Sequence, residues 1–137
     1  MAGDSAKEVE IGEVMPDGTV YAGVSPETGK AMFTTAADAP ATCGFPEAQE
    51  YAAKLDANGH LDWRVPTRDE LNEMYQNRAA IGGFEESGSD PGGWYWSSSQ
   101  SSCRNAWAQR FSDGYQDTSR KHNYTSVRYV RGSIKNI

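Results

Sequence analysis

The sequence has few aliphatic residues, only two histidines, and no long apolar run. No stretch approaches the roughly 20 apolar residues that a membrane-spanning helix requires, so we expect no membrane insertion. The N-terminus places Asp4, Glu8 and Glu10 around Lys7 and lacks the basic and apolar regions of a signal peptide. For the chain as given, this absence predicts a cytoplasmic location, with export or display on a particle as alternatives.

Groups that commonly carry catalysis or bind metals are also scarce. The two cysteines, Cys43 and Cys103, are too few for a disulfide framework and have neither metal-type nor redox-type spacing. We therefore expect free thiols rather than a bridge. His60 and His122 lie in no catalytic motif, and the cation Arg104 beside Cys103 is weak evidence for a reactive thiol. We predict no enzyme activity, no cofactor and no metal.

Rings and glycine are abundant instead, with 14 Gly, 4 Trp, 7 Tyr and 4 Phe in 137 residues. This composition is typical of one loop-rich domain with an aromatic core. We divide the chain into an N-terminal tail or first edge strand over residues 1–16 and one domain over residues 17–137. The residues assigned to the core include Trp63, Trp94, Trp96 and Trp107.

Charge is distributed unevenly along the chain. Residues 1–100 carry 6 Lys and Arg against 17 Asp and Glu, whereas residues 101–137 carry 7 against 2. A basic segment of this kind binds an acidic partner or rests on the acidic remainder of its own domain. Both interpretations stay open, and we favour the internal one.

The first half of the chain predicts a hairpin and a helix. Two β-prone runs, residues 19–24 and 31–33, are separated by Pro and Gly turn residues and predict a β-hairpin. Residues 45–55 have a proline in the first turn and apolar residues at helical spacing, so they predict an amphipathic helix. Its apolar positions are Ala48, Tyr51, Ala52 and Leu55.

A second helix begins at a capping box formed by Thr67 and Glu70 and is predicted to run to Ile81. Its core positions are Leu71, Met74, Tyr75 and Ile81. Residues 85–93 form a Gly- and Ser-rich loop, and residues 94–99 predict a strand. The remaining chain alternates short apolar anchors with polar stretches, which is typical of strands joined by exposed loops.

Two late arginines, Arg128 and Arg131, alternate with valines on a predicted strand. We assign both to structure rather than to binding. Acidic residues of the helices, such as Glu70 or Glu73, are their expected partners.

Short motifs in a specific order identify a family. They are Asp62-Trp63-Arg64-Val65-Pro66-Thr67, Glu70-Leu71, Tyr95-Trp96-Ser97-Ser98-Ser99, Ala106-Trp107, Phe111-x-x-Gly114 and Val127-Arg128-Tyr129-Val130-Arg131. With this set, roughly from Asp17 to Gly132, the chain resembles the Lcl C-terminal domain family. The resemblance implies an α+β class and a C-type-lectin-like fold, with two helices packed on small antiparallel sheets and long loops that carry the function. Calcium is not implied, because the Glu-Pro-Asn type of cluster in calcium lectins has no counterpart here.

The polar stretch 99–131 also resembles the variable region of proteins diversified by a retroelement. In that process, reverse transcription randomises the adenines of asparagine-type codons, which never yields Lys, Gln, Glu, Met or Trp. The excluded types Trp107, Gln109, Gln116 and Lys121 fall between the candidate positions. The candidate ligand-binding residues, all of permitted types, are Ser101, Ser102, Cys103, Arg104, Asn105, Ala108, Arg110, Ser112, Asp113, Tyr115, Asp117, Thr118, Ser119, Arg120, His122, Asn123, Tyr124 and Thr125. Ordinary surface loops favour many of the same residue types, so a merely solvated stretch remains an alternative.

The composition of this stretch is that of a recognition surface. Tyr115 and Tyr124 offer rigid amphipathic area, and Arg104, Arg110 and Arg120 offer forked donors. We predict recognition of a protein or other macromolecular ligand. One alternative is fixed binding of an acidic glycan or other polyanion, with nucleic acid the less expected polyanion. Another is a structural or assembly module.

Overall fold

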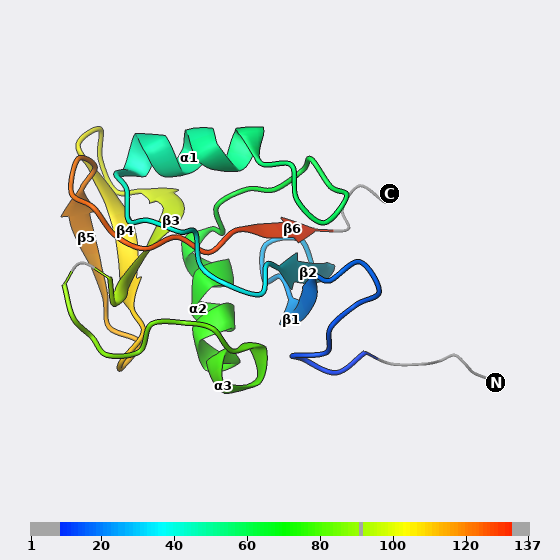
Figure 1. Cartoon of the computed structure of the whole chain (residues 1–137). Coiled ribbons are helices and arrows are strands. Elements are labelled where there is room, and N and C mark those ends of the chain that lie inside the picture. Colours follow the sequence, from blue (N-terminus) through cyan, green and yellow to red (C-terminus); the bar gives the residue numbers. More distant parts are fainter. Residues whose placement is uncertain (1–8, 91, 133–137) are drawn as a thin grey trace.

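Residues 9–90 and 92–132 are described in the computed structural model of the protein, which has an α+β fold. Two three-stranded antiparallel sheets lie side by side, and helix α2 (Arg68–Gln76) stands between them (Figure 1). It packs on β-strands of both sheets. None of the helices in this described part is long and apolar enough to cross a membrane. The predicted α+β class is confirmed.

The first sheet joins the two ends of the domain. Its strands are β1 (Val20–Val24), β2 (Ala31–Thr34) and β6 (Val130–Gly132), in the order β1-β2-β6. The predicted hairpin is therefore confirmed, with an irregularity between Tyr21 and Gly23. Because β6 pairs with β2, the last described strand lies beside the first hairpin.

The described part of the N-terminal segment lies along β1. Gly12 donates its N–H to the Tyr21 carbonyl at 2.9 Å, and Tyr21 donates to the Glu13 carbonyl at 3.0 Å. Gly12 has a φ of +93°, and a Cβ there would lie 2.3 Å from the Ala80 carbonyl oxygen. The position therefore requires glycine. Of the predicted segment 1–16, residues 1–8 lie outside the described residues.

A carboxylate at the start of the domain anchors the turn before β1. Asp17 Oδ2 lies 2.6 Å from His60 Nε2, and Asp17 Oδ1 accepts the N–H of Thr19 at 2.9 Å and its hydroxyl at 2.7 Å. The hydrogen bond with His60 is the main cause that lowers the pKa of Asp17 from 3.8 to about 2. These bonds stabilise the charged carboxylate in the folded state.

Replacing this carboxylate should change the acid sensitivity of the fold. A depressed folded pKa means that the Asp17 contribution is present above pH 3.8 and is lost as the pH falls through about 2. We expect Asp17→Asn to lower the free energy of unfolding at pH 5. The difference in this free energy from wild type should become smaller toward pH 2. Urea denaturation at several pH values measures it. A difference that stays constant with pH would contradict this assignment.

Helix α1 (Phe45–Lys54) covers the edge of the second sheet and confirms the predicted helix. It begins at Gly44 without a side-chain cap. Ala48 and Ala52 are buried, as their helical spacing predicted. The prediction is wrong for Tyr51, whose side chain is 52% exposed because it lies on the flank of the helix away from the sheet.

The second predicted helix is divided in two. The capping box is present, with Thr67 accepting the Glu70 N–H and Glu70 accepting the Thr67 N–H. However, α2 ends at Gln76, and α3 (Arg78–Ile81) follows as a separate turn. The break lies at Asn77, whose backbone leaves the helical region at φ −102° and ψ 14°. Its side chain donates instead to the Ala22 carbonyl of β1.

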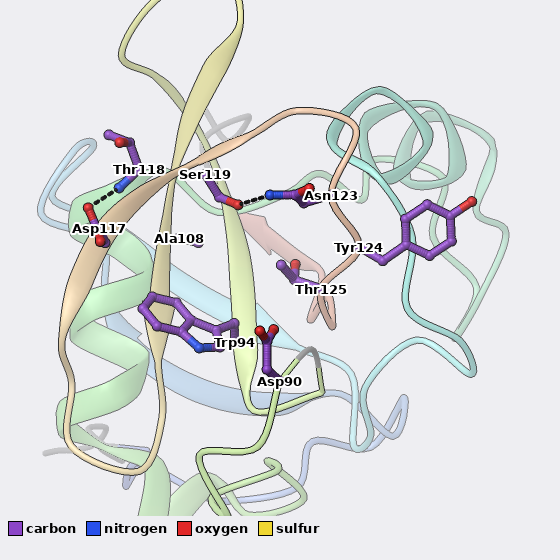
Figure 2. A pocket seen from close by; sticks show the side chains of 9 residues that line it. All are labelled: Asp90, Trp94, Ala108, Asp117, Thr118, Ser119, Asn123, Tyr124 and Thr125. Carbon is purple, nitrogen blue, oxygen red and sulfur yellow. Dashed lines mark hydrogen bonds between the residues drawn. The ribbon is translucent and has the colours of Figure 1, made fainter.

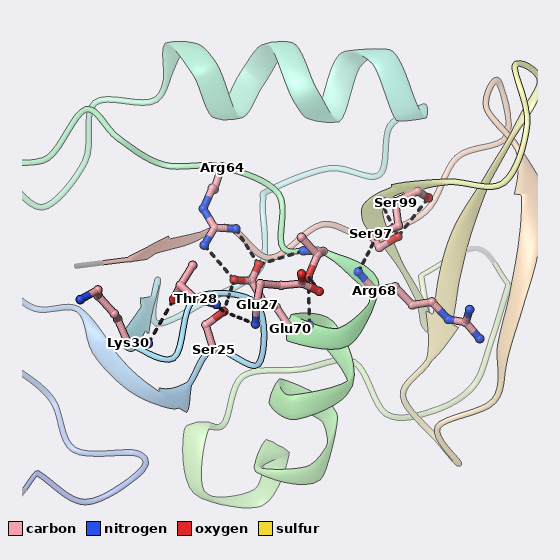
Figure 3. A network of polar contacts seen from close by, with 10 residues as sticks. Ser25, Glu27, Thr28, Lys30, Arg64, Arg68, Glu70, Ser97 and Ser99 are labelled. Carbon is pink, nitrogen blue, oxygen red and sulfur yellow. Dashed lines mark hydrogen bonds and ion pairs between the residues drawn. The ribbon is translucent and has the colours of Figure 1, made fainter. Parts of the chain in front are cut away.

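Glu70 has a structural role beyond the capping box (Figure 3). Its fully buried carboxylate accepts two hydrogen bonds from Arg64, at 2.6 and 2.9 Å, and one from the Ser25 hydroxyl at 2.5 Å. Burial alone would raise the pKa of Glu70, but the bonds from Arg64, Ser25 and Thr67 lower it. The carboxylate therefore ties α2 to the β1–β2 turn and to the segment before the helix.

The second sheet is built from β3 (Trp94–Gln100), β4 (Asn105–Arg110) and β5 (Gln116–Arg120), in that order. The free edge of β3 meets Ser126, which exchanges backbone hydrogen bonds with Trp94 and Trp96. On the other side β5 is the outer strand of the sheet.

The four tryptophans have different environments. Trp63 and Trp96 are buried in the largest core cluster, as predicted. The prediction is wrong for Trp94 and Trp107, which are only partly buried. Trp107 is covered by the guanidinium of Arg68, 3.7 Å above its ring, and Trp94 packs at the margin of the cluster. Both lie on strands at the periphery of the core.

The prediction that Arg128 and Arg131 pair with Glu70 or Glu73 is wrong. Arg64 lies next to α2 and occupies both oxygens of Glu70. The two late arginines instead pair with Asp38 and Asp62, which both lie in loops. Their assignment to structure nevertheless agrees with the contacts that they make.

Arg128 is the largest fully buried cation. Its Nε donates to Asp38 Oδ1 at 2.9 Å, and its two terminal nitrogens donate to the carbonyls of Thr35 and Gly82 at 3.0 and 3.1 Å. Tyr95 donates its hydroxyl to the same aspartate. Burial raises the pKa of Asp38 and lowers that of Arg128. Arg131 pairs with Asp62 in an exposed loop. These two pairs show that part of the basic C-terminal third rests on the acidic remainder of the domain.

Candidate ligand-binding site

The predicted binding stretch forms one end of the molecule. Residues 101–104 make the β3–β4 turn, residues 111–115 make the β4–β5 turn, and residues 121–125 return the chain across the sheet. Gly114 has a φ of +82°, and a Cβ there would lie 2.5 Å from the Tyr75 ring. This close approach explains the glycine of the Phe111-x-x-Gly114 motif.

Side chains of the types excluded from randomised codons face the body of the protein. Gln109 is 1% exposed and donates from Nε2 to Asn72 Oδ1 at 2.9 Å and to a turn carbonyl at 3.0 Å. Gln116 accepts a hydrogen bond from Arg68 of α2, the same arginine that covers Trp107. This face of the sheet therefore holds α2 in place.

The fourth excluded type, Lys121, has mixed contacts. Its ammonium donates to Gln100 Oε1 and lies 5.2 Å from the centre of the Phe45 ring. Its backbone carbonyl accepts the N–H of Phe45 at 2.8 Å, which joins the return segment to the start of α1. Lys121 also lines a pocket described below.

The opposite face of the sheet, with the return segment, forms a pocket of about 510 Å³ (Figure 2). We call it the Trp94 pocket. Asn123 Nδ2 donates to Ser119 Oγ at 3.0 Å across its wall. Its lining residues are Asp90, Trp94, Ala108, Asp117, Thr118, Ser119, Asn123, Tyr124 and Thr125.

The chemistry of the Trp94 pocket is aromatic and acidic. Two carboxylates, Asp90 and Asp117, line it, and within the described residues neither forms an ion pair. Trp94 supplies a partly exposed indole beside them. Arg110, whose guanidinium lies 5.5 Å from the Trp94 ring, pairs with Asp113 at 2.6 Å and does not line the pocket.

A second pocket of about 430 Å³ lies between the return segment, the β3–β4 turn and the start of α1. We call it the basic pocket. Among the described residues, Arg104 and Arg120 form no ion pair there. Tyr124, 59% exposed, lines this pocket as well as the Trp94 pocket. The lining residues are Pro46, Glu47, Arg104, Arg120, Lys121, His122 and Tyr124.

The remaining predicted binding residues lie outside both pockets, in the two turns or at the ends of β4. Two predicted residues, Ala108 and Thr125, line the Trp94 pocket but are buried at 2% and 4% exposure. The residues outside the pockets are Ser101, Ser102, Cys103, Asn105, Arg110, Ser112, Asp113 and Tyr115.

The β4–β5 turn nevertheless extends the aromatic surface. The rings of Tyr115 and Trp94 are 6.1 Å apart in an edge arrangement, and the Arg110 guanidinium lies 5.3 to 5.5 Å from both. Hydrogen bonding to Arg110 lowers the pKa of Asp113 to about 2. The turn is therefore organised by its own ion pair.

Both cysteines are free thiols, in agreement with the prediction. Cys103 is exposed at the β3–β4 turn, whereas Cys43 is buried beside α1. Burial raises the pKa of Cys43 to about 11. Its backbone pairs with Thr125, so this position supports the floor of the site through main-chain hydrogen bonds.

Sequence reasoning missed part of the site. Trp94 was assigned to the core, and Asp90, Pro46 and Glu47 were not singled out, although all four line a pocket. The charge of Asp90 in a Gly- and Ser-rich loop was an available signal. For Pro46 and Glu47 no local signal existed, because only the fold brings the start of α1 against the return segment.

The separation of the two faces predicts unequal tolerance to substitution. Asn123→Ala and Ser119→Ala change exposed or half-exposed side chains on the pocket face and should shift the melting temperature by less than about 2 °C. Gln109→Ala removes two buried hydrogen bonds and should cost about 2 kcal/mol. Thermal denaturation by circular dichroism compares them. Equal losses at all three positions would show that the site is part of the stabilising structure.

Comparison with known proteins identifies one family. The sequence profile of the Lcl C-terminal domain matches residues 24–131, which include both pockets and the motifs that carry the resemblance. No curated protein matches the chain.

Proposed function

The chain belongs to the Lcl C-terminal domain family, and from this premise we propose that it is a non-enzymatic domain that binds a protein or other macromolecular ligand through residues 101–125. The family is one of binding-type domains. One observation carries the proposal: two adjoining pockets, which share Tyr124, are lined mainly by residues 104–125. The C-type-lectin-like arrangement implied by the family accounts for a compact body that presents such loops.

The surface has the properties of a site open to variation. Trp107, Gln109 and Gln116 hold α2, whereas the candidate positions between them point outward or into the pockets. Substitution at these positions would change which ligand the surface binds without a large loss in the free energy of unfolding. We propose that the stretch is genetically diversified.

Diversification has a direct genetic test. The DNA around the gene should contain a reverse-transcriptase gene and a near-copy of the codons for residues 100–131 that differs only at adenines. Finding both establishes a diversified surface, whose ligand is then specific to this variant. Finding neither rejects diversification and leaves a binding domain of fixed specificity.

Binding itself is tested on defined protein and glycan arrays with the whole chain. The variant Asn123→Ala/Tyr124→Ala should lose its ligand by more than about tenfold in affinity, because exposed tyrosines dominate recognition surfaces. The matched control Glu50→Ala/Tyr51→Ala removes an exposed tyrosine from α1 and should bind like wild type. A ligand whose affinity falls equally in both variants, or falls in neither, would argue against this site.

A polyanion such as an acidic glycan is the second candidate, favoured by the unpaired guanidinium groups of Arg104 and Arg120 in the basic pocket. Such binding would weaken steeply between about 50 and 200 mM salt, because phosphate or sulfate contacts release counterions. A protein ligand would respond much less. Repeating the array measurement at both salt concentrations separates the two candidates.

A further inference from the structure

The two pockets have opposite charge. In the Trp94 pocket the charged lining residues are Asp90 and Asp117, and no cation lines it. In the basic pocket Arg104, Arg120 and Lys121 outnumber the single carboxylate, Glu47. A ligand that fills both pockets therefore meets two different electrostatic environments within one surface.

The lining of the Trp94 pocket suits a cation. An indole face attracts a guanidinium or ammonium group, and a carboxylate beside it adds a charge-assisted hydrogen bond. One carboxylate oxygen of Asp117 accepts the N–H of Thr118 at 2.8 Å, and its other oxygen forms no hydrogen bond with any described residue. Among the described residues no cation pairs with Asp90 or Asp117, and Arg110, whose guanidinium lies 5.5 Å from the Trp94 ring, pairs with Asp113 outside the pocket.

The lining of the basic pocket suits a carboxylate or another anion. Arg120 is exposed on β5, the outer strand of the sheet, and Arg104 is exposed on the β3–β4 turn. Both keep their guanidinium donors free of side-chain partners within the described residues. Such forked donors bind carboxylates in pairs of hydrogen bonds.

Tyr124 joins the two pockets. It belongs to both linings, and its side chain points outward from the return segment (Figure 2). A bound chain that crosses this ring would place consecutive side chains in one pocket and then in the other. The ring supplies apolar contact area between the two charged ends.

From these contacts we infer that the ligand is a protein segment carrying a basic and an acidic side chain close together, the basic one in the Trp94 pocket and the acidic one in the basic pocket. This inference rests on the proposed function and names the chemistry of its partner. A polyanion fits only half of the surface, because Asp90 and Asp117 repel it from the other half.

The test uses small probes of defined charge on the whole chain, followed by ¹H–¹⁵N NMR. N-acetyl-arginine amide should shift the Trp94 indole signal and the amide of Thr118. N-acetyl-aspartate amide should instead shift the amides of Lys121 and His122. Peptides that join Arg and Glu through zero to four glycines should include one that binds about tenfold more tightly than either single probe.

Charge-removing variants assign each end. Asp117→Asn should lower the affinity for the arginine probe about fivefold and leave the affinity for the aspartate probe unchanged. Arg120→Gln should lower only the affinity for the aspartate probe. The matched controls Asp56→Asn and Lys30→Gln make the same charge changes at exposed positions outside both pockets and should alter neither probe.

Two outcomes overturn the inference. One is an arginine probe that leaves the Trp94 indole unshifted while the anionic probe binds, which indicates a plain anion site. The other is probe binding that is the same in Asp117→Asn, Arg120→Gln and wild type. A third outcome separates the inference from the proposed function. If a macromolecular ligand from the arrays no longer binds Asn123→Ala/Tyr124→Ala but binds both charge variants like wild type, the proposed function stands and only this inference is rejected.

Discussion

Replacing Arg128 with methionine is expected to lower the free energy of unfolding by about 3–5 kcal/mol, because it leaves the charge of Asp38 partly buried without its partner. The change also removes the donors that reach the carbonyls of Thr35 and Gly82. Those acceptors would then be unsatisfied inside the protein. Urea denaturation at neutral pH, followed by tryptophan fluorescence, measures the loss.

A second variant separates charge from shape in this cluster. Arg128→Met/Asp38→Asn removes both charges and keeps an amide that accepts the Tyr95 hydroxyl. We expect the double variant to lose less than the sum of the two single losses, because each single variant strands one member of the pair. Additive losses, or a loss below about 1 kcal/mol for Arg128→Met, would show that the pair contributes little.

The Arg128 cluster also supports the loop that lines part of the Trp94 pocket. It ties the loop after β2 to the turn after α3, and that turn leads into the loop that carries Asp90. Loss of the cluster should therefore broaden the NMR signals of residues 85–90 before the protein unfolds. Residues of the basic pocket, which lie on other segments, should keep their signals.

The second large effect is expected at Glu70. Glu70→Gln keeps the size of the side chain but replaces one carboxylate oxygen with an amide nitrogen, which donates and cannot accept, and we expect a loss of about 3–5 kcal/mol in the free energy of unfolding. The donors of Arg64 and Ser25 would then compete for one oxygen. Chemical denaturation measures the loss at neutral pH.

The effect of Glu70→Gln should depend on pH. Because its folded pKa is lowered from 4.5, the wild-type contribution is present above that value and is lost as the pH falls through the folded pKa. The difference in the free energy of unfolding between wild type and variant should therefore become smaller at acid pH. Glu73→Gln, the same change one turn along α2 where the side chain is only partly buried, serves as control and should cost less than about 1 kcal/mol. Equal losses at both positions would contradict a special role of Glu70.

Much of the local structure is encoded in short patterns. The alternation of β-prone runs and turn residues predicted the first hairpin, and the Thr67 and Glu70 pair predicted the start of α2. Proline at the helix start and the small residues Ala48 and Ala52 predicted α1. These signals succeed because caps, turns and helical faces depend on residues within a few positions of each other.

The positions of the candidate site could also be read along the chain. The stretch 101–125 contains most of the lining of both pockets, and its excluded residue types, such as Gln109 and Gln116, do face α2. The restricted residue types therefore carried information about orientation. Ala108 and Thr125 also line the Trp94 pocket, but the pattern of residue types did not indicate that they are buried.

What the amino-acid sequence determined by itself was the order and type of most elements, the family, and the stretch that supplies most of the lining of the two pockets. Only the tertiary structure decided that Arg128 pairs with Asp38 and that Trp94 lines a pocket, because both contacts join distant segments. It also decided that two pockets of opposite charge meet at Tyr124. Such contacts depend on how sheets and loops pack in space, and no local spacing in the chain records that arrangement.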